Sequence, residues 1–149
     1  MGIAVHQRRL MAALILLGSA VAHAKEEAPG LPALGAANDQ ASVVGVSSGG
    51  YMASQLAVAW PERFSGVGML AAGPWGCAQG ALSLALNQCM MTRRGLPSLD
   101  ELEQRRERYL SLDQVGSQDA LSQLRAFVWH GDADETVSPG LGDLLAQQW

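Results

Sequence analysis

The sequence predicts an α/β fold built on a parallel sheet, because short apolar runs alternate along the chain with longer segments of helical periodicity. The runs are short and are flanked by glycine or polar residues, a pattern typical of buried strands. The predicted strands are residues 41–47, 65–73 and 124–131, and the helical segments are residues 49–64, in which Pro61 ends the helix, 98–112 and 138–149.

The first predicted helix follows its strand with only a short glycine-rich turn between them. Met52, Leu56, Ala59 and Trp60 recur at helical spacing and define its apolar face, and Pro61 ends it. Residues 74–91 come after the second strand. They contain both cysteines, and we predict an excursion held by a disulfide rather than a regular element.

Charge excludes one class of function. The net charge is −4, and the basic residues are scattered along the chain, so we predict no nucleic-acid surface.

The second helix begins with a capping box, in which Ser98 and Glu101 each satisfy an orphan amide of the first turn. Its charged run "EQRRER" predicts a solvated helix face rather than a binding patch.

The first 24 residues have the organisation of a secretory signal. Two arginines precede an apolar stretch at residues 10–21, and an A-x-A cleavage site follows at residues 22–24. The stretch is shorter than the roughly 20 residues that a membrane span needs. We therefore predict export to the periplasm or the medium, no stable membrane span after cleavage, and one small domain at residues 25–149.

The two cysteines, Cys77 and Cys89, are expected to form a disulfide, because export places them in an oxidising compartment. They are too few to make a zinc site, and no histidine is spaced to complete one. No metal or other cofactor is predicted.

The turn between the first strand and the first helix carries the chemistry. Gly45-Val46-Ser47-Ser48-Gly49 fits G-x-S-x-G, the nucleophile elbow of serine hydrolases. The serine must project from a tight, strained turn, and small residues two places before and after it leave room for that turn. Ser47 is therefore the predicted nucleophile, and the amide of Ser48 the predicted donor to an oxyanion.

A second polar cluster, "VWHGDADETVSP", follows the third strand. In serine hydrolases of this type, the acid that orients the histidine lies in a loop after a later strand. Asp134 and Asp132 are both candidates for that acid. A polar turn without a catalytic role remains the alternative.

Two stretches together resemble the extracellular and periplasmic poly(3-hydroxybutyrate) depolymerases and their esterase relatives. They are "GVSSGGYMASQLAVAWPERFSGVGMLAAGPWGCA" and "VWHGDADETVSP". The resemblance implies an α/β-hydrolase-type parallel sheet with helices on both faces. It also implies Ser47 as the nucleophile, and it favours Asp134 over Asp132 as the acid. The implied partner is a polyester or a small ester.

The chain has no histidine after Asp134, where the triad base is expected. Its three histidines are His6 and His23, both in the predicted signal, and His130, which precedes the acid. Some members of the family are circularly permuted, which fits an elbow that comes so early. We therefore expect the chain to be a truncated, N-terminal part of such an enzyme, inactive alone, with His130 a structural residue rather than a substitute base.

The sequence leaves three functions open. The first is a secreted serine esterase of the polyhydroxyalkanoate-depolymerase type, which attacks esters through an acyl-enzyme. The second keeps the fold but changes the substrate, as in a carboxylesterase, a feruloyl-type esterase or, less well supported, a peptidase. The third is a non-catalytic remnant or binding protein.

Overall fold

The computed structural model describes residues 30–37 and 40–149. The predicted signal at residues 1–24 lies outside the described residues. The chain divides into two units, Met1–Ala36 and Ala37–Trp149. Every helix and strand named below belongs to the second unit.

The described residues of this unit form three strands, five α-helices and a short 3-10 helix, η2 (Pro61–Arg63). The strands are β1 (Ser42–Val46), β2 (Gly66–Leu70) and β3 (Arg125–Trp129), and the helices are α2 (Ser48–Ala59), α3 (Leu82–Asn87), α4 (Leu99–Leu110), α5 (Gln118–Ser122) and α6 (Pro139–Gln148). The three predicted strands and three predicted helices are all present, whereas the short helices α3 and α5 were not predicted. Ser98 caps α4, and its Oγ accepts from the amide of Glu101 at 3.4 Å.

The three strands form one parallel sheet in the order β1-β2-β3. Val44 pairs with Gly68, and Gly68 pairs with Phe127, so the three strands run in step. This confirms the predicted parallel α/β sheet. Because the strands are parallel, the loops that follow β1, β2 and β3 all begin at the carboxyl ends of the strands. Ligands bind at this end of open α/β sheets.

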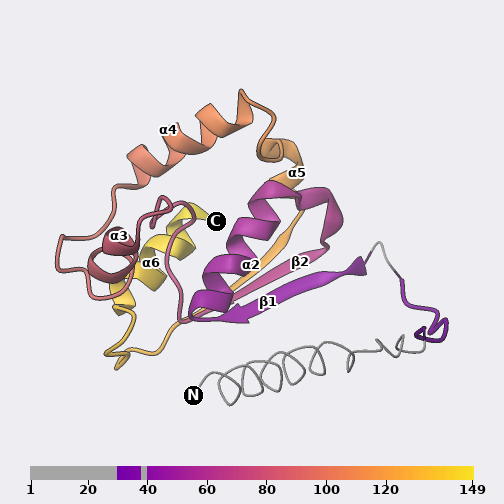
Figure 1. Cartoon of the computed structure of the whole chain (residues 1–149), viewed down its shortest axis with the longest axis horizontal. Coiled ribbons are helices and arrows are strands. Elements are labelled where there is room, and N and C mark those ends of the chain that lie inside the picture. Colours follow the sequence, from indigo (N-terminus) through magenta and orange to yellow (C-terminus); the bar gives the residue numbers. More distant parts are fainter. Residues whose placement is uncertain (1–29, 38–39) are drawn as a thin grey trace, which may run out of the picture. The chain divides into compact units, whose positions relative to one another are not determined.

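One face of the sheet is covered by α2 and α6, and the hydrophobic core lies there. Figure 1 shows α2 along β1 and β2. The core cluster joins α2, β2, the residue Ala72 and α6 through Ala53, Ala57, Val67, Met69, Ala72 and Leu145. Small residues on α2 let the helix approach the strands closely. The predicted apolar face of this helix was wrong, because Met52 and Trp60 are 57% and 55% exposed.

The opposite face of the sheet is apolar and exposed. Val44, Val46, Phe127 and Trp129 alternate with core-facing residues and are 55–67% exposed. The prediction that residues 41–47 and 124–131 are buried strands is therefore wrong, since each buries only one side. The α2 and α6 helices pack against the other face, and no second helix layer is found among the described residues.

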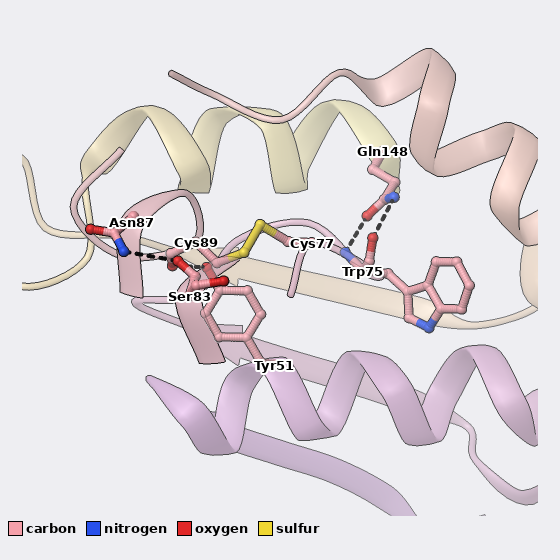
Figure 2. The surroundings of a disulfide bond; sticks show 7 residues. All are labelled: Tyr51, Trp75, Cys77, Ser83, Asn87, Cys89 and Gln148. Carbon is pink, nitrogen blue, oxygen red and sulfur yellow. Dashed lines mark hydrogen bonds between the residues drawn. A yellow bond between two sulfur atoms is a disulfide. The ribbon is translucent and has the colours of Figure 1, made fainter. Parts of the chain in front are cut away.

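Residues 71–98 leave the sheet after β2 and are held by the predicted disulfide. Cys77 and Cys89 are bonded and almost fully buried. Figure 2 shows two further attachments of this excursion. The hydroxyl of Tyr51 on α2 donates to the Cys89 carbonyl at 2.6 Å, and the side-chain amide of Gln148 on α6 bonds both backbone polar groups of Trp75.

The disulfide gives a simple test of the fold. The two cysteines are 12 residues apart, so the bridge should stabilise the protein by roughly 2–3 kcal/mol through the chain entropy of the unfolded state. We expect thiol titration of exported, denatured protein to find no free thiol without reductant. Two free thiols per chain would contradict the bridge, and a reduced sample with two titratable thiols is the control.

Candidate active site at the nucleophile elbow

Ser47 lies between the last residue of β1 and the first residue of α2. Its backbone has φ 54° and ψ −123°, a conformation that residues with a side chain rarely adopt. The amide of Ser47 donates to the Leu70 carbonyl at 2.8 Å, which extends the pairing of β1 with β2 to this residue. The predicted strand-turn-helix context is thus confirmed, and the strain falls on the serine itself.

Glycines make the tight turn possible, but only one of the two predicted glycines, Gly45, lies where a side chain would not fit. A Cβ at Gly45 would collide with the Gly49 carbonyl, and one at Gly50 would lie 2.8 Å from the Cβ of Ala72. A Cβ at Gly49 would meet nothing within 4 Å. The crowded residue on the helix side is therefore Gly50, and the expectation that Gly49 must be small to leave space is wrong.

The first turn of α2 offers unpaired amides beside Ser47. The first intrahelical bond runs from the Tyr51 amide to the Ser47 carbonyl at 3.1 Å, which leaves the amides of Ser48, Gly49 and Gly50 without helical acceptors. The side chain of Ser47 makes no capping bond with this turn. Its hydroxyl is therefore not consumed by the helix, and the Ser48 amide stands at the positive end of the helix dipole.

Asp134 is fixed in the turn after β3. Its Oδ1 accepts from the amides of Thr136 at 2.8 Å and Val137 at 2.9 Å. These bonds, that of Val137 first, hold the pKa of Asp134 below its usual range. The stabilisation they give is therefore present above the ordinary pKa of an aspartate, about 4, and is lost as the pH falls through the lower folded-state value. Asp132 lies exposed in the same turn.

His130 is committed to the same turn. Its Nε2 lies 2.9 Å from the Val137 carbonyl and 3.4 Å from Oδ2 of Asp134. Because a carbonyl only accepts, Nε2 carries a hydrogen. Nδ1 is buried without a partner among the described residues, and the ring packs against Gly142 of α6. This histidine holds the Asp134 turn together: Nε2 is bonded to the Val137 carbonyl, and Nδ1 is buried and does not line the cavity beside Ser47.

A cavity of about 440 Å³ lies beside the elbow. It is lined by Ser47 and Ser48 from the elbow, by α2, by the disulfide excursion and α4, and by Val137 from the Asp134 turn. Its walls are mostly apolar or aromatic, with Met52, Met90 and Tyr109 among them. The structure thus brings the elbow and the neighbour of Asp134 to one cavity, whereas Asp134 and His130 do not line it.

Sequence reasoning missed two residues of this site. Tyr51 lines the cavity and ties α2 to the disulfide excursion, and burial raises the pKa of its hydroxyl, which stays a proton donor. Arg105 also lines the cavity. The prediction that "EQRRER" is a solvated face is wrong for Arg105 and Arg106, which are both partly buried. The sequence did hold a signal for Arg105. It lies three residues after Leu102, the buried residue of α4, so the two side chains share one face of the helix.

Residues 30–37 and 40–149 contain no group of three or more His, Cys, Asp or Glu side chains arranged to hold a metal ion. No helix in this part of the chain has the length and apolar character of a membrane span.

Curated proteins and solved structures are similar to this chain in sequence and fold. The chain is 35% identical over 135 residues to the poly(3-hydroxybutyrate) depolymerase of Delftia acidovorans, covering 90% of this chain and 26% of that protein. It is 35% identical over 136 residues to the polyhydroxybutyrate depolymerase of Talaromyces funiculosus, covering 91% of this chain and 37% of that protein. No protein-family model matches.

The structural comparison agrees. The PHB depolymerase from Penicillium funiculosum, and a PHB depolymerase variant complexed with an R3HB trimer, each superpose with a TM-score of 0.58 at 34% identity. Each match covers 74% of this chain and 34% of the other. The predicted resemblance is therefore confirmed. About nine tenths of this chain is similar to poly(3-hydroxybutyrate) depolymerases, and the match covers between a quarter and two fifths of those proteins.

Proposed function

We propose that these residues form part of a secreted serine esterase of the polyhydroxyalkanoate-depolymerase type, with Ser47 as its nucleophile. The observation that carries the proposal is the backbone of Ser47, which has a positive φ at the junction of a parallel strand and a helix and borders a cavity. A strained serine at that junction is the device by which α/β-hydrolases expose an Oγ for attack.

Each residue has a defined role in the proposed reaction. Ser47 Oγ attacks the ester carbonyl and gives its proton to a histidine base, and the amide of Ser48 donates to the oxyanion. The alcohol leaves with that proton, and water then hydrolyses the acyl-enzyme. Asp134 orients the base and stabilises its charged form. Its Oδ1 is held by two amides, which favours the ionised acid that this role requires.

The base is not supplied by the described residues, because His130 is bonded to the Val137 carbonyl and buried against α6. The chain spans only part of the curated relatives, because the matched residues make up 37% of one and 26% of the other. We propose that residues 25–149 are the N-terminal part of the catalytic domain and that the histidine comes from another part of the enzyme.

Export is part of the proposal. Residues 1–24 have the charge, apolar stretch and cleavage site of a secretory signal, and the buried disulfide suits an oxidising compartment. A polyester that cells do not take up must be hydrolysed outside the cytoplasm, so secretion or export to the periplasm is consistent with such a substrate.

The proposal predicts that the 149-residue chain has no Ser47-dependent activity by itself. A serine hydroxyl is a weak nucleophile without an adjacent base. The purified chain should therefore hydrolyse p-nitrophenyl butyrate no faster than its Ser47→Ala variant. Turnover that depends on Ser47 and disappears in His130→Asn would contradict the assignment of His130 to the turn.

The positive test uses an extended chain. The extended chain is defined as residues 25–149 joined to the part of the Talaromyces funiculosus relative that the match does not cover. We expect it to hydrolyse p-nitrophenyl butyrate and soluble 3-hydroxybutyrate oligomers. A folded extended chain that hydrolyses neither ester would count against the proposed function.

A further inference from the structure

Arg105 is the charged residue of the cavity beside Ser47. Among the described residues that line this cavity, the others are apolar, aromatic or neutral polar. Arg105 lines the cavity from α4, the helix that also contributes Tyr109 to it. A single guanidinium in a mostly apolar cavity is the kind of polar group that fixes the orientation of a ligand.

The charge of Arg105 has no counter-ion in the described part of the chain. Its one hydrogen-bond partner is neutral, since Nη2 donates to Oε1 of Gln79 at 2.8 Å, and its Nε is buried without a partner. Arg106 also has a buried nitrogen without a partner, Nη1, but it differs in having a counter-ion, because it makes a bidentate ion pair with Glu103. Burying part of an unpaired guanidinium is unfavourable, so the position of Arg105 is not explained by the stability of this part of the chain.

The loop over Arg105 is held in an unusual shape. Gly76, Gln79 and Gly80 have φ values of 77°, 51° and 73°, and Gln79 is the residue of these three for which a left-handed backbone is unfavourable. A Cβ at Gly76 would lie 3.7 Å from Cδ of Arg105, so the loop packs directly on the arginine stem. The disulfide at Cys77 anchors the same loop. These contacts hold the aliphatic stem of Arg105 beside the cavity, and the guanidinium is only partly buried.

We propose that Arg105 is a specificity-determining residue that binds a carboxylate of the substrate. This inference rests on the proposed function and narrows its substrate class to esters of hydroxy acids that carry a free carboxylate, such as short soluble oligomers, over neutral alkyl esters. The planar guanidinium matches a carboxylate. The apolar walls then contact the aliphatic part of the oligomer, and the ester reaches the elbow at the same cavity.

The test measures binding, which needs no catalytic base. The probes are the linear trimer of 3-hydroxybutyrate as the free acid and the same trimer as its methyl ester, titrated into the chain and followed by ligand-observed NMR. The variants are Arg105→Met, which keeps the aliphatic stem, and Arg105→Lys, which keeps the charge. Arg106→Met is the matched control, because Arg106 is the adjacent arginine of α4 and does not line this cavity.

The acid should bind the unaltered chain about tenfold tighter than the methyl ester, the size expected for one hydrogen-bonded charge pair. Arg105→Met should remove that preference and leave the affinity for the methyl ester unchanged. Arg105→Lys should keep part of it, and Arg106→Met all of it. Weaker binding of the acid at high salt is also expected.

Four outcomes would overturn the inference. They are equal binding of the acid and the ester, equal weakening of both by Arg105→Met, loss of the preference in Arg106→Met as well, and binding of neither ligand. If the chain binds the ester without favouring the acid, the inference fails while the proposed esterase stands. If it binds neither ligand, the inference fails, and the proposed function is then judged by the residue that a covalent esterase probe labels in the extended chain.

Discussion

Replacing Ser47 with alanine in the extended chain is expected to abolish ester hydrolysis, with a loss on the order of 10⁶-fold in kcat, the size seen when a serine hydrolase loses its nucleophile. The strained backbone at Ser47 is expected to relax little, because Gly45 and Gly50 are packed against neighbouring backbone. The loss should therefore come from the missing Oγ. Hydrolysis of p-nitrophenyl butyrate, with circular dichroism to verify the fold, measures it.

Ser48→Ala is the matched control for that variant. Ser48 is exposed, and its proposed contribution is the backbone amide, which alanine retains. Most of the activity should therefore remain. The reverse result, with Ser48→Ala inactive and Ser47→Ala active, would exchange the two assignments.

The second large effect is expected at Asp134. In the extended chain, Asp134→Asn should keep the two bonds that Oδ1 accepts from Thr136 and Val137, so the turn should hold its shape. It removes the negative charge that orients and stabilises the protonated histidine, a loss of roughly 10⁴-fold in kcat in a comparable triad. The measurement is kcat for p-nitrophenyl butyrate.

Asp132→Asn provides the comparison for this variant. Asp132 is exposed, two residues away in the same turn, and should tolerate the change with little effect on kcat. A large loss in Asp132→Asn together with a small one in Asp134→Asn would show that Asp132 is the acid. Small and equal losses of kcat in both variants would show that neither aspartate of this turn is the triad acid.

The elements near the elbow could be predicted from the sequence because their signals are local. The glycines around Ser47, the cap at Ser98 and the alternation of strands with helices all act through residues close in the chain. The disulfide could be predicted from the secretory-signal pattern and from there being two cysteines. The bonds of the Asp134 turn also join near neighbours, although which of two aspartates would accept them was left to the resemblance.

What could not be predicted depends on which element packs against which. Met52 and Trp60 share a helical face, yet α2 packs on the sheet through Ala53 and Ala57, because only small residues allow the close approach. Phe127 was expected to be buried and is 60% exposed, since a strand's own pattern does not say whether both faces are covered. Arg105 lies in a charged run that predicts an exposed helix face. It lines a cavity because the loop at Gln79, distant in sequence, packs beside it.

The most direct test of the proposed nucleophile is the site at which a fluorophosphonate probe reacts with the extended chain. Such probes form a covalent bond with an activated serine hydroxyl, and peptide mapping by mass spectrometry identifies the modified residue. We predict a single adduct on Ser47 that is absent from Ser47→Ala and from heat-denatured protein. An adduct on Ser48, or on any other residue while Ser47 stays unmodified, would contradict the proposal that this elbow presents Ser47 for attack on an ester.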